Sequence, residues 1–257
     1  MPILEAHGNQ LEFGWYGERT PGRPTLVFMH HGLGSVEQWR DFPLKLSEAT
    51  GCPAFAYSRV GYAGSDSAQW PWPVDIFKTD GRERLPKVLA AAGIDDLILV
   101  GHSDGASISL VYGADVRTGL RGIIVEAPHL FAQTDNIEEI NRTRENYASG
   151  DLRERLKKFH GENVDSAFYG WAETWIQPAF QAFSIEDLIP RIEVPVLAIR
   201  GVEDAYCTSK QIDQLSALAQ CSLQVAAPDC GHDPHQEMEA EMLDLMTGFI
   251  RPLLDPA

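Results

Sequence analysis

The chain has 257 residues, of which 44% are hydrophobic and 23% are charged, an ordinary globular composition. Its formal net charge of −16 argues against nucleic acid and membrane surfaces as partners, because their phosphates would repel it. No apolar run approaches the length of a membrane-spanning helix, and the first residues lack the basic and apolar regions of a secretory signal. We therefore expect a cytoplasmic protein and keep a homodimer open as its assembly.

Buried strands alternate with helices along the first half of the chain. Continuous apolar runs are typical of parallel strands that are covered on both faces. We predict one or two edge strands within residues 1–16 and buried strands at 25–29, 52–57, 97–100 and 122–127. We predict helices that begin at Ser35, where Gln38 completes a capping box, and helices over 74–92 and 106–112. This alternation predicts a parallel sheet with helices on both faces.

The alternation is interrupted once, by a long segment without a convincing strand. Within it we predict helices over 136–148, 151–160 and 165–176. Afterwards the chain resumes with strands at 194–200 and 223–225 and helices at 209–219 and 236–250. The sequence thus predicts one α/β core, formed by residues 1–129 and 188–257, with a helical insertion at 130–187.

The turn after the third buried strand presents a serine between two glycines. Residues 97–107 read L-I-L-V-G-H-S-D-G-A-S, so a G-x-S-x-G pattern lies between a strand and a helix. A serine at so sharp a turn adopts a strained backbone, and Gly101 and Gly105 have no Cβ that would clash with the neighbouring strand and helix. Ser103 is therefore the candidate nucleophile.

A serine hydroxyl needs a base, and the base needs an orienting acid. In sheets of this pattern, the acid and then the histidine follow the nucleophile in the chain. Asp204 follows a predicted strand, and His232 follows the last one, so both groups come at the carboxyl ends of strands. Glu203 is the alternative acid. For the oxyanion hole we expect the backbone N–H groups of Leu33 and Asp104.

These motifs together resemble the α/β-hydrolase family. They read H-G-L-G at 31–34, S-R-V-G-Y-A-G-S at 58–65, G-H-S-D-G at 101–105, G-V-E-D at 201–204 and C-G-H at 230–232. The resemblance implies an eight-stranded, mostly parallel sheet with a helical cap inserted after strand six. It also implies Ser103 as nucleophile, Asp204 as acid and His232 as base.

The serine excludes the relatives in that family that use an aspartate nucleophile, the haloalkane dehalogenases and epoxide hydrolases. Acyl chemistry remains. We expect a carboxylesterase-like serine hydrolase that cleaves a small or medium carboxylic ester or thioester through an acyl-enzyme on Ser103, with a small-molecule acyl substrate and without a cofactor. Two alternatives stay open: a C–C bond hydrolase of ring-cleavage products, which shares the triad, and a hydrolase-fold ligand receptor with little turnover.

The insertion carries an aromatic stripe at helical spacing, formed by Phe168, Trp171 and Trp175. Such a stripe either packs the insertion onto the core or lines an apolar pocket. We keep these three residues, together with His102 beside the nucleophile, as candidate pocket residues.

Metal and disulfide signals are weak. The histidines at 30, 31, 232 and 235 lack a framework of thiolate or carboxylate ligands, so we expect no metal. The cysteines at 52, 207, 221 and 230 have no C-x-x-C spacing, so we expect free thiols. A Cys221–Cys230 disulfide stays open.

Overall fold

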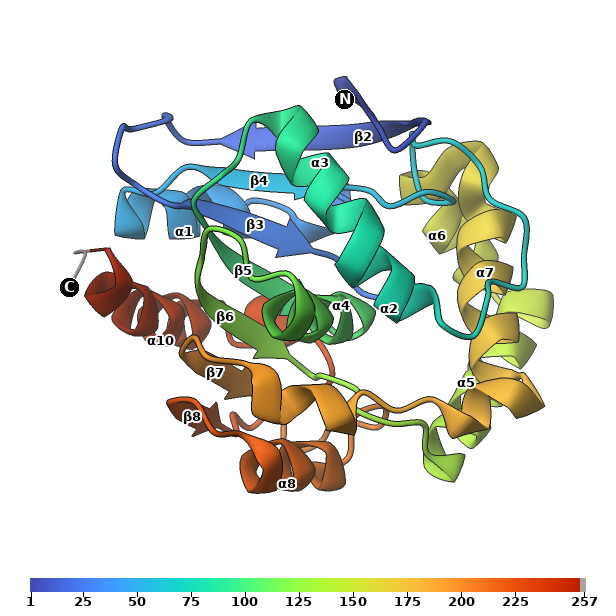
Figure 1. Cartoon of the computed structure of the whole chain (residues 1–257). Coiled ribbons are helices and arrows are strands. Elements are labelled where there is room, and N and C mark those ends of the chain that lie inside the picture. The colour runs from blue at the N-terminus through green and yellow to red at the C-terminus, as the bar shows by residue number, and fades with distance from the viewer. Residues whose placement is uncertain (255–257) are drawn as a thin grey trace.

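Eight strands form one sheet in which six neighbouring strands run parallel (Figure 1). The computed structural model describes residues 1–254, excluding the side chains of residues 134–136. The sheet order is β1-β2-β4-β3-β5-β6-β7-β8, and β2 pairs antiparallel with both β1 and β4. The strands are β1 (Ile3–Ala6), β2 (Asn9–Tyr16), β3 (Thr25–Met29), β4 (Ala54–Tyr57), β5 (Leu97–His102), β6 (Leu120–Glu126), β7 (Val196–Ile199) and β8 (Leu223–Ala226). The predicted eight-stranded, mostly parallel sheet is confirmed.

Helices cover both faces of this sheet. The α-helices are α1 (Phe42–Thr50), α2 (Ile76–Thr79), α3 (Leu85–Ala92), α4 (Asp104–Asp115), α5 (Thr134–Ser149), α6 (Leu152–His160), α7 (Val164–Ile176), α8 (Ser209–Leu218), α9 (Pro234–Glu237) and α10 (Glu239–Ile250). Short 3-10 segments lie at Glu37–Trp39, Gly161–Asn163, Pro178–Ala182, Glu186–Arg191 and Arg251–Leu253, and Asp80–Arg84 forms a π turn.

Alternate residues of each buried strand point to opposite faces and enter two separate apolar clusters. On β3, Leu26 and Phe28 pack with side chains of α1 and α10, such as Phe42 and Met246. Val27 belongs to the other cluster, which includes α3, α4 and the residues between β6 and β7. Because both faces are covered, the strands carry continuous apolar runs.

The segment between β6 and β7 carries α5, α6 and α7, which lie together beyond the end of the sheet toward which β3 and β6 point (Figure 1). Its two ends meet. Phe131 and Ser184 form an antiparallel bridge, and the N–H of Ile185 donates to the carbonyl of Leu130 at 2.7 Å. The helical segment therefore leaves the core and returns to it at the same place, where residues 130–131 contact residues 184–185.

One of two local helix predictions was wrong. The helix expected from Ser35 is a 3-10 turn followed by α1, because Arg40 between them has a φ of 53°, which a continuous helix does not contain. No side-chain cap bond forms at this start. The helix expected over 74–92 is found as an unbroken helical segment over 76–92, formed by α2, the π turn and α3, and Pro86 lies in the first turn of α3.

All four cysteines are free thiols. Within residues 1–254, no helix is long and apolar enough to cross a bilayer.

Candidate active site

Ser103 lies at the turn between β5 and α4, with a φ of 54° and a ψ of −116°, values that residues other than glycine rarely adopt. A Cβ at Gly105 would lie 2.0 Å from the carbonyl oxygen of Met29, and one at Gly101 would lie 2.5 Å from the carbonyl oxygen of Gly105. The close approach of the chain therefore requires both glycines. The turn places Ser103 on the wall of a cavity.

His232 and Asp204 come from loops that follow the neighbouring strands β8 and β7. Nδ1 of His232 lies 2.9 Å from both carboxylate oxygens of Asp204. The backbone N–H groups of Tyr206 and Cys207 donate to Oδ1 of Asp204 at 2.8 and 2.9 Å, which fixes the carboxylate. Burial lowers the pKa of His232, but the hydrogen bond with Asp204 and the charges of Asp204, Asp233 and Asp104 together outweigh burial and raise the pKa above its ordinary value. Glu203, the alternative acid, is exposed.

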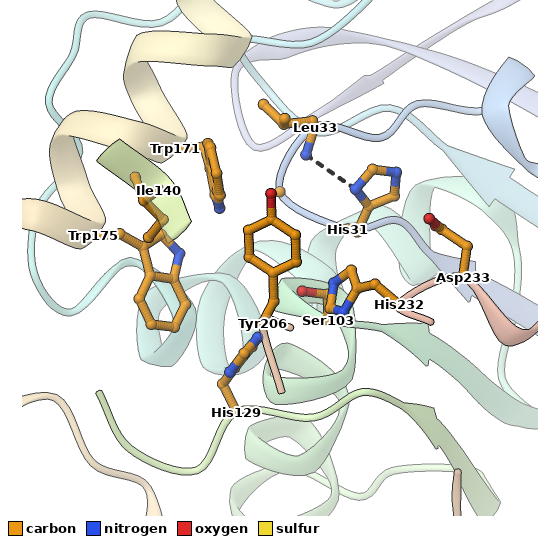
Figure 2. A pocket seen from close by; sticks show the side chains of 11 residues that line it. His31, Leu33, Ser103, His129, Ile140, Trp171, Trp175, Tyr206, His232 and Asp233 are labelled. Atoms are coloured by element: carbon orange, nitrogen blue, oxygen red, sulfur yellow. Dashed lines mark hydrogen bonds between the residues drawn. The ribbon is translucent and has the colours of Figure 1, made fainter. Parts of the chain in front are cut away.

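A cavity of about 190 Å³ opens beside Ser103 and His232 (Figure 2). Its wall is formed by His31, Gly32, Leu33, Ser103, His129, Ile140, Trp171, Trp175, Tyr206, His232 and Asp233. Loops at the carboxyl ends of the strands supply most of these residues, and α5 and α7 supply Ile140 and the two indoles. Of the described residues, no lysine or arginine lines the cavity.

The structure divides the four candidate pocket residues into two pairs. Trp171 and Trp175 line the cavity, and their rings face it in Figure 2. Phe168 does not line it, because its fully buried ring stacks on Tyr147 of α5 with ring centroids 3.6 Å apart. His102 does not line it either, because its side chain is fully buried and its Nε2 lies 2.8 Å from the carbonyl oxygen of His232. For Phe168 and His102 the expectation is corrected.

The two expected oxyanion donors come from the residue after Ser103 and from the loop after β3. Asp104 is the first residue of α4, so its backbone N–H has no acceptor within the helix. The N–H of Leu33 donates to Nδ1 of His31 over 3.3 Å, a long hydrogen bond (Figure 2). Nε2 of His160, from α6, lies 2.9 Å from the carbonyl oxygen of Leu33. The N–H of Leu33 must therefore release Nδ1 of His31 before it can donate to an oxyanion.

Burial keeps the imidazoles around Ser103 neutral. It lowers the pKa of His129 to about 3 and that of His102 to about 4. The pKa of His31 is also held well below its ordinary value by burial and by the neighbouring His102 ring. Burial raises the pKa of the Asp104 carboxyl to about 6, although the nearby Arg59 guanidinium opposes this. Neutral donors and acceptors thus dominate the polar part of the site.

Arg59 does not reach the cavity. Its guanidinium donates to the carbonyl oxygens of His30 and His31, the latter at 3.2 Å, and Nε lies 3.9 Å from the buried carboxylate of Asp80. Arg59 therefore holds the loop after β3 and is not placed to meet a substrate.

His129 and Tyr206 line the cavity but were missed in the sequence. His129 follows the end of β6 by three residues, so the rule that functional groups gather at the carboxyl ends of strands could have indicated it. Tyr206 stands two residues after Asp204 in the same loop, and its hydroxyl lies 2.8 Å from Oγ1 of Thr143 on α5. Nothing in the sequence signals that contact.

Two groups of side chains have ligand atoms within 4.8 Å of one another, the spacing of a metal site. They are His31, His102 and Asp233, and His102, Glu126 and His235. In the second group, Nδ1 of His235 lies 2.7 Å from Oε2 of Glu126, whereas Oε1 of Glu126 is buried without a hydrogen-bond partner among the described residues. We describe the second group as a hydrogen-bonded histidine–carboxylate cluster behind the cavity.

Comparison with known proteins places this architecture in a family. The model of the alpha/beta hydrolase family matches residues 26–245, most of the chain. The chain belongs to the alpha/beta hydrolase family. Among characterised members, 2-succinyl-6-hydroxy-2,4-cyclohexadiene-1-carboxylate synthase from Salmonella typhimurium is 25% identical, over 90% of this chain and 95% of that one.

Solved alpha/beta hydrolase structures have the same fold. An enol-lactonase from Burkholderia xenovorans superposes with a TM-score of 0.77 at 18% identity, over 97% of this chain and 99% of that one. A thermophilic esterase from Thermogutta terrifontis superposes with a TM-score of 0.73 at 16% identity, over 99% of both chains. At such identities the likeness establishes the fold and leaves the reaction to be argued from the site.

Proposed function

We propose that this alpha/beta hydrolase is a serine hydrolase that cleaves a small or medium carboxylic ester or thioester through an acyl-enzyme on Ser103. The observation that carries the proposal is the pair Asp204–His232, hydrogen bonded at 2.9 Å, on the same cavity as a serine in a strained turn. A serine becomes a nucleophile at neutral pH when an oriented imidazole takes its proton.

In the first half of the proposed reaction, the Ser103 oxygen attacks the acyl carbon while its proton moves to His232. Asp204 keeps the imidazole oriented and stabilises the imidazolium that forms. The backbone N–H groups of Asp104 and Leu33 receive the oxyanion, for which Leu33 releases His31. The tetrahedral intermediate then collapses, the alcohol or thiol leaves with the proton of His232, and Ser103 carries the acyl group.

In the second half, His232 takes a proton from water, and the resulting nucleophile attacks the acyl-enzyme. Collapse of the second intermediate returns the proton to Ser103 and releases the carboxylic acid. The same groups therefore act twice, once for each tetrahedral intermediate.

The helices α5–α7 act in this proposal as a cap over the site. Ile140 of α5 and Trp171 and Trp175 of α7 supply apolar surface to the cavity above Ser103. An apolar roof excludes water from the reacting carbonyl and strengthens the hydrogen bonds to the oxyanion.

A direct experiment tests the nucleophile. The protein is incubated with a fluorophosphonate and with p-nitrophenyl butyrate. We expect one phosphonyl adduct, on Ser103, and ester turnover that Ser103→Ala abolishes together with the adduct. Ser149→Ala, which removes an exposed serine at the end of α5, serves as the matched control and leaves both readouts unchanged. Full turnover by Ser103→Ala refutes the assignment.

The characterised relatives suggest a second candidate, the formation of a cyclohexadiene carboxylate rather than hydrolysis. Their similarity extends over 90% of this chain. The product named for those relatives carries a carboxylate and a succinyl group, whereas the wall of this cavity has no lysine or arginine among the described residues. That difference favours the hydrolase. The C–C bond hydrolase shares the triad and also forms the adduct, so much faster turnover of ring-cleavage products than of simple esters identifies it. Ligand binding without turnover of any ester identifies the receptor.

A further inference from the structure

We propose that the cavity selects an uncharged acyl group that carries a hydrogen-bonding oxygen, and that His129 is the residue that binds this oxygen. The inference rests on the proposed function, because it names the class of ester that the Ser103 site accepts. It follows from the charges on the cavity wall and from one buried imidazole without a partner.

Among the residues that the structure describes, no lysine or arginine on the cavity wall is available to an anionic substrate. The guanidinium of Arg59 is engaged by backbone carbonyls and by Asp80. Asp233 stands on the wall itself; burial raises the pKa of its carboxyl, but the nearby histidines outweigh this and hold the pKa below its ordinary value, so a carboxylate faces the cavity. A carboxylate on the acyl group would lose its hydration and meet like charge.

His129 has an unsatisfied hydrogen-bonding group at this cavity. Its side chain is 3% exposed and lines the cavity, and Nδ1 has no hydrogen-bond partner among the described residues. Its ring packs edge-on against that of Trp175, with ring centroids 5.0 Å apart. The centroid of the His232 ring lies 6.4 Å away. Nδ1 is buried from solvent, so the nitrogen open to the cavity is Nε2, which forms no hydrogen bond with the described residues. A ligand oxygen that accepts from Nε2–H would give this imidazole its first hydrogen bond.

The backbone of His129 is fixed relative to the nucleophile. Its N–H donates to Oγ of Ser107 at 3.2 Å, and its carbonyl oxygen accepts from the same hydroxyl at 2.7 Å. Ser107 stands one turn after Ser103 on α4, and its N–H donates to the carbonyl of Ser103 at 3.1 Å. His129 therefore keeps a constant place relative to the reacting carbonyl, as a specificity-determining residue must.

The cavity size limits the acyl group. The cavity has a volume of about 190 Å³ and is partly open to solvent. A short acyl chain with one oxygen a few carbons from the ester fits this space.

Three ethyl esters with the same number of non-hydrogen atoms test the inference. Ethyl 4-oxopentanoate carries a neutral oxygen, ethyl 4-methylpentanoate replaces that oxygen by a methyl group, and ethyl hydrogen succinate carries a negative charge at the same place. Released ethanol gives kcat and KM for each. We expect kcat/KM for the 4-oxo ester to exceed that for the methyl ester about tenfold and that for the anion about a hundredfold.

His129→Leu then lowers the ratio between the 4-oxo and 4-methyl esters to about one, through KM more than kcat. His7→Leu makes the same substitution in the turn between β1 and β2, far from the cavity, and keeps the wild-type ratio. The inference is overturned if kcat/KM for the anionic ester equals that for the 4-oxo ester, or if His129→Leu keeps the wild-type ratio between the 4-oxo and 4-methyl esters. Neither result contradicts the proposed esterase activity. No turnover of any ester by a protein whose Ser103 takes up no fluorophosphonate overturns the proposed function itself.

Discussion

Glu126 and His235 tie the end of β6 to the loop that carries His232: Nδ1 of His235 lies 2.7 Å from Oε2 of Glu126, and both side chains are buried. The ring of His102 lies between this pair and the proposed triad, with centroids 5.0 Å from His232 and 5.2 Å from His235. The site thus contains a second histidine–carboxylate pair, whose histidine lies in α9, three residues after His232. It is placed to hold the loop rather than to touch a substrate.

Glu126→Gln tests this positioning role. The amide keeps the size of the side chain but cannot match a carboxylate as partner of His235, so we expect a loss of about 1–3 kcal/mol in the free energy of unfolding. We expect kcat to fall several-fold with KM nearly unchanged, because the loop that carries His232 becomes less ordered. Denaturant unfolding and ester kinetics measure the two effects.

Glu239→Gln provides the control for that variant. Glu239 forms a partly exposed ion pair with Lys45 at 2.7 Å, so its loss costs about 1 kcal/mol or less and leaves kcat unchanged. Equal effects of the two substitutions would contradict the role of Glu126.

Asp204→Asn changes the acid limb of the pH–rate profile. His232 must be neutral to act as base, and the hydrogen bond with Asp204 raises the pKa of His232, so wild-type activity falls as pH drops through a value above 6.5. Without the carboxylate, burial dominates and lowers that pKa, so the residual activity extends to lower pH. We expect kcat itself to fall about 10³–10⁴-fold.

The matched control is Glu203→Gln at the preceding, exposed position, which keeps the wild-type profile. If Glu203→Gln loses activity and Asp204→Asn retains it, the acid has been assigned to the wrong residue.

Asp104→Asn makes stability less dependent on pH. Burial raises the pKa of the Asp104 carboxyl to about 6 from 3.8, so the unfolded chain loses this proton at a lower pH than the folded protein does. Wild-type stability therefore declines as pH rises from 4 to 6, on the order of 2–3 kcal/mol, and is flat above that range. The asparagine keeps an oxygen for Nε1 of Trp175, now 3.3 Å from Oδ1, and has no such titration. Urea unfolding at several pH values should show that the free energy of unfolding of the variant rises relative to that of the wild type between pH 4 and 6. A difference that does not change with pH would refute the raised pKa of Asp104.

Gly105→Ala tests the tight turn. The new Cβ would lie 2.0 Å from the carbonyl oxygen of Met29, a backbone atom that cannot rotate away, so we expect a loss of more than about 3 kcal/mol or failure to fold. Gly248→Ala in α10 meets no atom within 4 Å and should stabilise the protein by about 0.5–1 kcal/mol, since alanine favours a helix over glycine. Comparable melting temperatures for the two variants would contradict this account of the turn.

Local sequence determined the strands and the turn that carries Ser103. The strand predicted at 25–29 is β3 (Thr25–Met29), because a parallel strand covered on both faces needs an unbroken apolar run. The sequence also predicted the tight turn from the glycines on either side of Ser103, because a Cβ at either position would overlap neighbouring backbone atoms. The order of Asp204 and His232 at strand ends likewise brought them to one edge of the sheet.

Only the tertiary structure decided which side chains form the cavity. His102 stands next to Ser103 in the chain yet is buried behind it, whereas His129, distant in sequence, reaches the wall. Phe168 and Trp171 share one helix, but one stacks on Tyr147 and the other meets the cavity. Helical spacing shows that a face is buried and not which neighbour covers it, because that neighbour comes from a distant segment whose place is set by packing.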